Sequence, residues 1–283
     1  MLVPVTKFSK QFFQTMHKLG TRFIGLSLLA ILTSYALLAY VVVPALWQHY
    51  EHQPGLANLP MVTTTKFKVA GDPMNVALVG SREELIAVMT AAGWVEPDRT
   101  TVLSSAKMAR SVALRRSYVR APVSSLFYQG HRQDLAFEKQ HGKDARQRHH
   151  IRLWKVLEAG AEGRPVWLGA ATFDQGVGFS HFTGQVTHHI SADVDAERNF
   201  LIHDLKATLR LSLLYEVSGT GPIFWARNGG GDVYHSDGEV EVAVIAPAAA
   251  VQTLPAQVLP APALTSFKDE VWARVTGTQI NNP

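Results

Sequence analysis

The hydrophobic pattern of the chain begins with one long apolar run near the N-terminus. No residue from Phe23 to Tyr50 carries a full charge, and Leu, Ala, Val and Ile dominate the stretch up to Trp47. A helix needs about 20 predominantly apolar residues to cross the hydrocarbon core of a bilayer, and this run is longer. Tyr40 and Trp47 lie towards its C-terminal end, where aromatic rings favour the membrane interface. The pattern therefore predicts a single transmembrane helix over residues 23–48.

A cleaved signal peptide is the alternative interpretation of this run. Such peptides have an apolar core of about 7 to 15 residues, followed by a cleavage site made of small residues. The run here is longer than such a core, and the segment Tyr40-Val-Val-Val-Pro44 near its end offers no such site. We therefore favour a helix that stays in the membrane.

After the apolar run, the pattern changes to that of a folded domain. Residues 49–67 contain two prolines and one glycine and are typical of a linker. Asn75-Val-Ala-Leu-Val79 then predicts a short buried strand, after which Ser81 begins a helix. Glu84 follows Ser81 at the spacing of a capping box, and Gly93 is suited to end the helix.

Further downstream, the pattern predicts several strands and further helices. The strands are expected over residues 125–128, 134–138, 149–156, 165–173, 187–190, 212–217, 223–226 and 239–245. The helices are expected over residues 104–116 and from residue 191 or 193 to about residue 209. We expect the first two strands to flank a turn at Gly130, and the last strand to be buried on one face only.

This mixture of helices with strands joined by tight turns predicts an α+β fold. The expected domain, residues 68–246, is a single mixed, largely antiparallel sheet with packed helices. Residues 247–283 are expected to form a Pro/Ala-rich linker and a short C-terminal helix.

Charge is distributed unevenly along the chain. Residues 1–50 contain no Asp or Glu but carry four basic residues, which are Lys7, Lys10, Lys18 and Arg22. They account for the whole net charge of +4, because the chain has 27 basic and 23 acidic residues. Because basic flanks stay on the cytoplasmic side, we expect residues 1–22 in the cytoplasm and the domain on the outer side of the membrane, which is the periplasm if the cell is Gram-negative. The balanced charge of the domain argues against nucleic acid as a partner.

Motifs in the middle of the chain carry a family resemblance. They are Ala121-Pro-Val-Ser-Ser-Leu-Phe-Tyr-Gln-Gly130, Gln133-Asp-Leu-Ala-Phe137, Arg148-His-His-Ile-Arg-Leu-Trp154, Val166-Trp-Leu-Gly-Ala-Ala-Thr-Phe-Asp174 and Thr187-His-His-Ile-Ser-Ala-Asp-Val-Asp-Ala-Glu-Arg198. In this order they resemble the LssY C-terminal domain family of bacterial envelope proteins. The resemblance implies a bacterial membrane location, but no established reaction and no site residues. In that family the domain often follows membrane segments, some of which belong to lipid-phosphate phosphatase-like or DedA-like regions, whereas this chain has one hydrophobic segment.

Histidines and carboxylates of this central region are candidate ligands for a metal ion. Neutral imidazoles and carboxylates bind zinc or another divalent ion, and three of them with a water molecule form a hydrolytic site. The candidates are His150, His181, His188, His189, Asp134 and Asp193. Neighbouring residues of a strand point to opposite faces, so if His150 shares a face with Arg152, His149 points to the apolar side. The alternative is that these histidines are structural and hydrogen-bonded. The chain has no cysteine, which excludes thiolate ligands.

Arg148 and Arg152 are candidates for binding an anion, because a guanidinium pairs well with phosphate or carboxylate. The alternative is that they lie on a solvated face or pair with Asp134, Glu138 and Asp174.

Two hypotheses of function follow. In the first, the domain binds or hydrolyses an anionic envelope component such as a lipid phosphate. In the second, it is a non-catalytic interaction or assembly module whose partners are other membrane or envelope proteins.

Overall fold

The computed structural model describes most of the 283 residues. The described residues are 5–43, 45, 52–56, 59–98, 101, 103–104, 107, 110–111, 114, 118–142, 147–182, 184, 186–217, 224–247, 254–261 and 263–277. The helix predicted over 104–116 lies largely outside them. The chain divides into two units, Met1–Tyr50 and Glu51–Pro283, and each is described by itself.

The described part of the N-terminal unit is helical. It consists of α1 (Val5–Leu37) and a π-helical turn, Leu38–Val42. The stretch Gly20–Val42 is long and apolar enough to cross a membrane, and none of its most apolar window is buried. The described part of the predicted apolar run is therefore helical, and the helix also includes much of the basic segment before it; residues 44 and 46–48 of the run lie outside the described residues.

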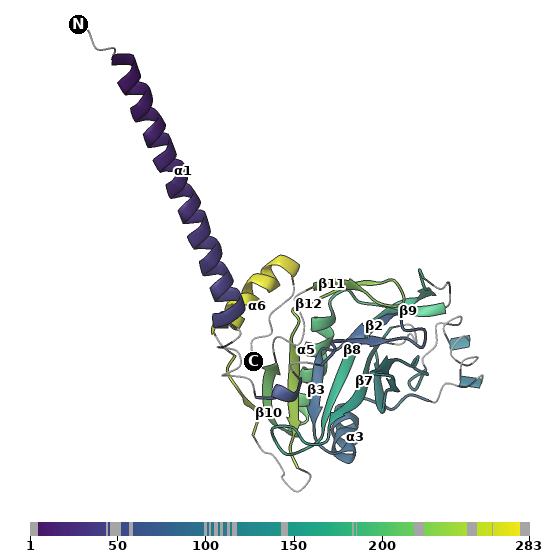
Figure 1. Ribbon diagram of the computed structural model, residues 1–283. Coiled ribbons are helices and arrows are strands. Elements are labelled where there is room, and N and C mark those ends of the chain that lie inside the picture. The colour runs from purple at the N-terminus through teal and green to yellow at the C-terminus, as the bar shows by residue number, and fades with distance from the viewer. Residues whose placement is uncertain are drawn as a thin grey trace. The chain divides into compact units, whose positions relative to one another are not determined.

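The second unit is built on a mixed sheet that has eight strands within the described residues (Figure 1). Its strands are β3 (Val76–Val79), β6 (Leu135–Gln140), β7 (Arg148–Leu157), β8 (Val166–Phe179), β9 (Val186–Ile190), β10 (Leu211–Val217), β13 (Val240–Ile245) and β14 (Gln257–Val258). Their order is β14-β10-β13-β3-β8-β7-β6, and β9 pairs with the second part of β8. All neighbours are antiparallel except β10 with β14 and β13 with β3. The predicted α+β fold with a mixed, largely antiparallel sheet is confirmed.

Smaller elements pack around this sheet. They are the four-stranded antiparallel sheet β2 (Ala70–Pro73), β1 (Val62–Thr64), β4 (Phe127–Tyr128) and β5 (His131–Arg132), and the hairpin β11 (Phe224–Arg227) and β12 (Val233–Ser236). The helices are α3 (Arg82–Ala91), α5 (Val194–Ala207), α6 (Ala263–Thr276) and a single 3-10 turn, Pro54–Leu56.

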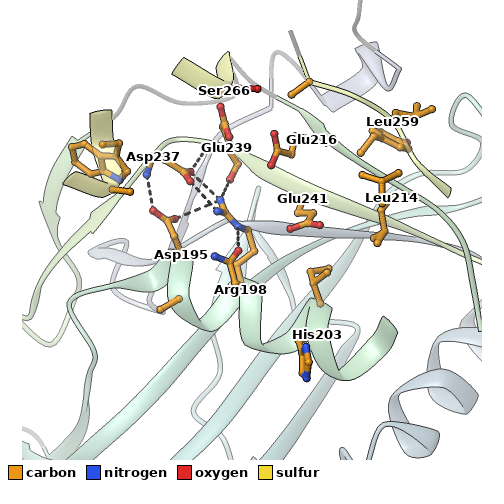
Figure 2. A pocket seen from close by; sticks show the side chains of 18 of the residues that line it. Asp195, Arg198, His203, Leu214, Glu216, Asp237, Glu239, Glu241, Leu259 and Ser266 are labelled. Carbon is orange, nitrogen blue, oxygen red and sulfur yellow. Dashed lines mark hydrogen bonds and ion pairs between the residues drawn. The ribbon is translucent and has the colours of Figure 1, made fainter. Parts of the chain in front are cut away.

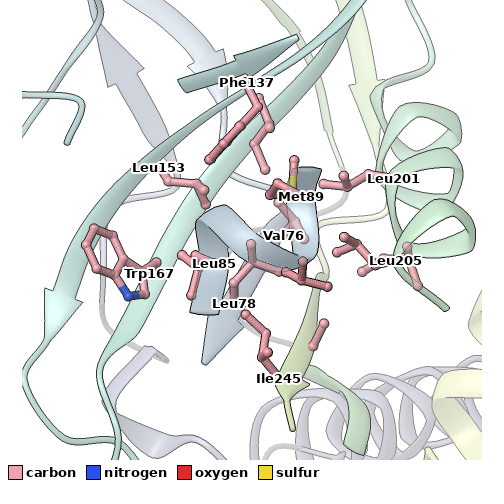
Figure 3. Close-up of a cluster of buried hydrophobic side chains, with 14 of the residues drawn as sticks. Val76, Leu78, Leu85, Met89, Phe137, Leu153, Trp167, Leu201, Leu205 and Ile245 are labelled. Carbon is pink, nitrogen blue, oxygen red and sulfur yellow. The ribbon is translucent and has the colours of Figure 1, made fainter. Parts of the chain in front are cut away.

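Two large apolar cores lie on opposite faces of the large sheet. Strand β3 contributes to both, because its side chains alternate between the faces. Val76 and Leu78 belong to the core that α3 and α5 cover (Figure 3), whereas Ala77 and Val79 belong to the core on the side of the small sheet. The layers are therefore helices, large sheet and small sheet. Strand β13 has buried side chains on both faces, so the expectation that residues 239–245 are buried on one face only was wrong.

Helix α3 has the termini that the sequence predicts. The hydroxyl of Ser81 accepts a hydrogen bond from the N–H of Glu84, and the Glu84 carboxylate accepts one from the N–H of Ser81. Gly93 has a φ of 82°, which favours glycine, and the following N–H of Trp94 donates to the carbonyl of Met89. Both the capping box and the glycine C-cap are confirmed.

Other local predictions need correction. The turn at Gly130 joins β4 to β5, whereas β6 pairs with β7 in the other sheet. The segment predicted as a linker, residues 49–67, contains β1 and the fully buried Leu56. The Pro/Ala-rich segment after residue 246 contains β14, which extends the large sheet. Pairing of these short segments depends on distant strands, so local sequence carries little signal for it.

Candidate functional site

The candidate residues of β7 divide between the two faces of the large sheet, as the alternation rule predicts. Ile151 and Leu153 lie in the core under the helices, and His149 bonds to Glu197 of α5 on that side. Arg148, His150 and Arg152 point the other way. Opposite them on β8 stand Thr172, which pairs with His150, and Asp174, which pairs with Arg148. The face towards the small sheet therefore holds a buried cluster of polar residues, which we call the Asp174 cluster. Its members are Asp72, Glu138, Arg148, His150, Arg152, Thr172, Asp174 and His188.

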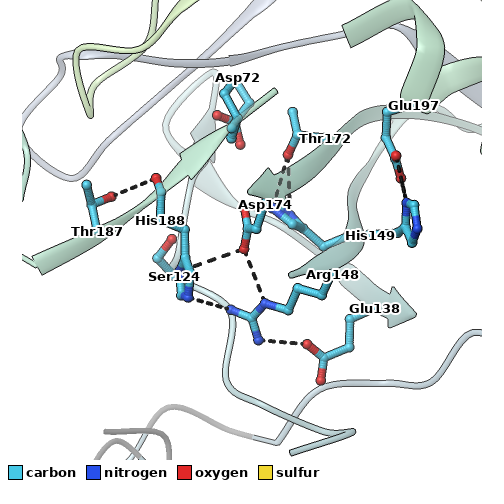
Figure 4. Close-up of polar contacts among 12 residues, drawn as sticks. Asp72, Ser124, Glu138, Arg148, His149, Thr172, Asp174, Thr187, His188 and Glu197 are labelled. Atoms are coloured by element: carbon cyan, nitrogen blue, oxygen red, sulfur yellow. Dashed lines mark hydrogen bonds and ion pairs between the residues drawn. The ribbon is translucent and has the colours of Figure 1, made fainter. Parts of the chain in front are cut away.

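Asp174 is the central acceptor of this cluster (Figure 4). Its Oδ1 accepts a hydrogen bond from Nε2 of His150 at 2.6 Å, and its Oδ2 accepts one from Nε of Arg148 at 3.2 Å. Burial alone would raise the pKa of this carboxyl, but His150, His188 and Arg148 together hold the pKa of Asp174 well below its usual range. Asp174 is therefore ionised, and its charge orders the donors around it.

The tautomer of His150 follows from its neighbours. Nη1 of Arg152 lies 3.1 Å from Nδ1 of His150, and because a guanidinium can only donate, Nδ1 must be the acceptor. The ring proton is then on Nε2, from which it is donated to Asp174. Burial lowers the pKa of His150, which agrees with a neutral ring. Both ring nitrogens are thus engaged, and a metal ion would have to displace one of these hydrogen bonds.

Both candidate anion-binding arginines are committed to carboxylates of the protein. Arg148 and Arg152 are each 3% exposed. Nη1 of Arg148 donates to Glu138 at 2.9 Å in addition to the bond to Asp174, and Nη1 of Arg152 donates to Asp72 at 2.9 Å. That Arg148 and Arg152 bind an external anion stays a prediction, and such an anion would have to displace these carboxylates. The alternative considered from the sequence was that these arginines pair with carboxylates of the domain. Arg148 does pair with Glu138 and Asp174, whereas Arg152 pairs with Asp72.

Glu138 is the least satisfied member of the Asp174 cluster. Its Oε2 accepts from Arg148, but its buried Oε1 has no hydrogen-bond partner among the residues that the structure describes. Burial raises the pKa of Glu138 to about 8, against the opposing effect of Arg148. The charge balance of the Asp174 cluster also favours a protonated Glu138. The two arginines balance Asp72 and Asp174, so the cluster is neutral when Glu138 holds a proton.

The histidines after β8 do not extend this cluster into a set of metal ligands. His188 has a side chain that is 23% exposed, and its Nδ1 lies 3.8 Å from Oδ2 of Asp174. Arg148 donates to Nε2 of His188 at 3.4 Å, and burial lowers the pKa of His188 to about 4. His189 points elsewhere and pairs through Nδ1 with Asp232 at 2.6 Å, while the exposed His181 ring lies 6.0 Å from the ring of His189.

The two candidate aspartates have local roles. Asp134 is exposed and accepts a hydrogen bond from the N–H of Lys155 at 2.9 Å. Asp193 caps the N-terminus of α5 by accepting from the N–H of Ala196 at 2.9 Å. In the part of the chain that the structure describes, no group of three or more His, Asp or Glu side chains is arranged to hold a metal ion. The six residues predicted as metal ligands therefore do not converge, because the alternating strands and the helix cap separate them.

A second histidine environment lies on the helix side and was not predicted. Nδ1 of His149 lies 2.8 Å from the buried carboxylate of Glu197. The ring of His149 stacks on Phe200 with centroids 4.0 Å apart, and Phe173 and Trp94 surround it. This His–Glu pair joins β7 to α5 across the apolar core. This pair could not be predicted from the sequence. An acid in the first turn of a helix is already explained by the helix dipole, so Glu197 gave no reason to expect a histidine partner.

A cavity of the domain was also not predicted. It has a volume of about 980 Å³ and lies between α5, β10, β13 and α6 (Figure 2). Beside it, Arg198 of α5 donates to both carboxylate oxygens of Asp237, at 2.9 and 2.8 Å. Asp195 accepts from the N–H of Asp237 at 2.7 Å, and burial raises the pKa of Asp195 to about 6.

Comparison with known proteins gives one match. The model of a family described as LssY C-terminus matches residues 56–240, which run from the 3-10 turn to the start of β13. No curated protein and no solved structure matches the chain. The matched range covers about two thirds of the chain and includes the Asp174 cluster and most of the large sheet. The chain therefore belongs to the LssY C-terminus family.

Proposed function

We propose that this chain is a single-pass protein of a bacterial inner membrane whose family domain lies on the outer side and acts as a non-catalytic binding module. The observation that carries the anchor is the stretch Gly20–Val42, in which large apolar side chains are exposed. Exposure of apolar surface to water costs roughly 25 cal/mol per Å², and a bilayer removes that cost. The basic residues before this stretch, with no acids among the first 50 residues, support a cytoplasmic N-terminus.

The internal pairing of the Asp174 cluster supports a binding module rather than an enzyme that acts on an anion. Arg148 and Arg152 have carboxylate partners, and both nitrogens of His150 are engaged. An anionic ligand would have to break buried ion pairs, and breaking one by removing a partner typically costs about 3–5 kcal/mol. One observation favours the hydrolytic alternative: His188 is uncharged and partly exposed, and it lies beside Arg148.

Fractionation of cells that carry a C-terminally tagged chain tests the anchor. The full-length product is expected in the membrane fraction after a high-salt wash, and deletion of residues 1–50 is expected to release the tag from the membrane. Protease added to spheroplasts should degrade the domain and leave a short N-terminal fragment. A salt-extractable full-length product, a protected domain or a mature N-terminus beyond residue 42 would each contradict the proposed anchor.

Metal analysis of the purified chain separates the binding module from the hydrolytic alternative. We expect no stoichiometric divalent metal, and we expect His188→Ala to leave the metal content and the fold unchanged. His150→Ala is expected to lower the unfolding temperature, because it removes one hydrogen bond from Asp174 and one from Arg152 inside the buried cluster. One bound metal ion per chain that His188→Ala abolishes would favour the hydrolytic site instead.

A further inference from the structure

The cavity beside α5 is open to a small molecule and has an acidic lining. Its volume of about 980 Å³ is that of a ligand site rather than a packing defect. Its carboxylate-bearing lining residues are Asp195, Glu216, Asp237, Glu239, Glu241 and Glu270. Two cationic side chains, Arg198 and Lys206, stand against these six. The lining is therefore negatively charged, which favours a cationic ligand and disfavours an anionic one.

The positive charge of Arg198 is already used by the protein. Its guanidinium forms a bidentate pair with Asp237, donates to the carbonyl of Glu239 at 3.2 Å and lies 3.6 Å from Asp195. These contacts hold α5 against the turn between β12 and β13. They leave the guanidinium little capacity to neutralise other carboxylates of the cavity.

Glu241 is the carboxylate that lacks compensation. It lies on β13, in the interior of the large sheet, and its side chain is on the face that α5 covers. Within the described residues its carboxylate forms no hydrogen bond or ion pair, although Arg198 and Lys206 act on it at longer range. Burial raises the pKa of Glu241. The Glu241 side chain is only partly buried, so its carboxylate is accessible from the cavity, and a cation that enters the cavity would supply the partner that it lacks among the described residues.

The other end of the cavity is apolar. Leu214 of β10 lies there together with Val258 and Leu259, which belong to or follow β14 (Figure 2). The cavity thus presents carboxylates at one end and aliphatic side chains at the other. Such a lining matches a ligand in which a cationic group is attached to an aliphatic chain.

We infer that this cavity binds an organic ammonium ion, with the ammonium group beside Glu241 and an aliphatic portion along Leu214 and Leu259. The inference deepens the proposed binding role by giving its ligand class. It does not depend on the membrane anchor. The fractionation experiment tests only the anchor and the ligand-binding experiment tests only the cavity, so a negative result in one leaves the other unaffected. An aliphatic amine satisfies both ends of the cavity, whereas an alcohol of the same length satisfies only the apolar end and a carboxylate is repelled.

Calorimetric titration of the full chain in detergent tests this inference, with hexylammonium, hexan-1-ol and hexanoate as probes and protein-free micelles as blanks. Hexylammonium is expected to bind saturably, and at least about tenfold more tightly than either other probe, because only it gains a charge-assisted contact. Equal binding of the alcohol, or tighter binding of hexanoate, would overturn the inference. This comparison needs no variant and stands whether or not a variant folds.

Glu241→Gln tests the position of the ammonium group. The amide has nearly the same shape and removes a charge without a partner, so the variant is expected to fold and to bind hexylammonium about tenfold or more weakly. Glu158→Gln is the matched control, because Glu158 is exposed and does not line the cavity. Unchanged hexylammonium affinity in a folded Glu241→Gln variant overturns the assignment to this carboxylate.

Discussion

Replacement of Asp174 by asparagine tests whether the Asp174 cluster stabilises the domain as its geometry indicates. The substitution keeps the shape of the side chain but leaves one acceptor oxygen where there were two. In the native protein His150 donates to Oδ1 and Arg148 donates to Oδ2. An asparagine amide must therefore direct its NH2 group at one of these donors, whichever way it is oriented.

The expected cost follows from the burial of the groups left behind. Asp174 is 2% exposed and Arg148 is 3% exposed, so solvent cannot replace the lost carboxylate. Removal of one partner from a buried pair costs about 3–5 kcal/mol. Domains are stable by about 5–15 kcal/mol, so Asp174→Asn should take away a large share of the stability. The exposed pair of Lys155 and Glu158 provides the comparison, and Glu158→Gln should cost less than about 1 kcal/mol.

Chemical unfolding of the full chain in detergent, followed by tryptophan fluorescence, measures both variants, because Trp94, Trp154 and Trp167 are buried in the domain. The pH dependence adds a second readout. Since the folded pKa of Asp174 is depressed, its contribution is present above the ordinary value of 3.8 and is lost as the pH falls through the folded pKa. The difference between wild type and Asp174→Asn should therefore shrink in acid. A cost no greater than that of Glu158→Gln at neutral pH would refute this account of the cluster.

Three further substitutions test other parts of the domain. Glu138 has its pKa raised to about 8 from 4.5, so wild-type stability should fall as the pH rises through this interval, and Glu138→Gln should remove that slope from the unfolding free energy. Asn75→Ala leaves two carbonyls and one N–H of β8 and α5 unsatisfied, at roughly 1–3 kcal/mol each, and a small shift in the unfolding temperature would contradict this bridging role. Ser81→Ala removes the cap of α3 and should cost about 1 kcal/mol, or about 2–4 °C in thermal melts; no change would show that the capping box contributes nothing.

Features that depend on nearby residues could be predicted from the sequence. The capping box of Ser81 and Glu84 needs only a spacing of three residues, and the structure forms both of its hydrogen bonds. The separation of His149 from His150 needs only the alternation of a strand, and the two rings do lie on opposite faces of β7. In both cases the geometry is set by the backbone, whatever the rest of the chain does.

Pairing between distant residues could not be predicted in the same way. The sequence suggested Asp134 as a partner for the arginines, but Arg152 pairs with Asp72, which comes from β2 of the small sheet. Likewise, Arg198 finds Asp237 only because α5 packs beside the turn after β12. Choosing among many carboxylates requires the tertiary fold, because each of them fits an arginine equally well in isolation. The cavity was missed for the same reason, since its walls come from segments far apart in the chain.

The Asp174 cluster has a structural consequence that does not require a ligand. A shift of β7 by one residue against β8 would move Arg148, His150 and Arg152 to the face covered by α3 and α5. There they would meet the apolar core around Ile151 and Leu153 and lose every carboxylate partner. Three buried polar groups without partners cost far more than the native pairs gain, so the cluster penalises this register heavily. The charges that looked like a binding site thus favour one alignment of the central strands, and that alignment positions α5 above the sheet where the cavity forms.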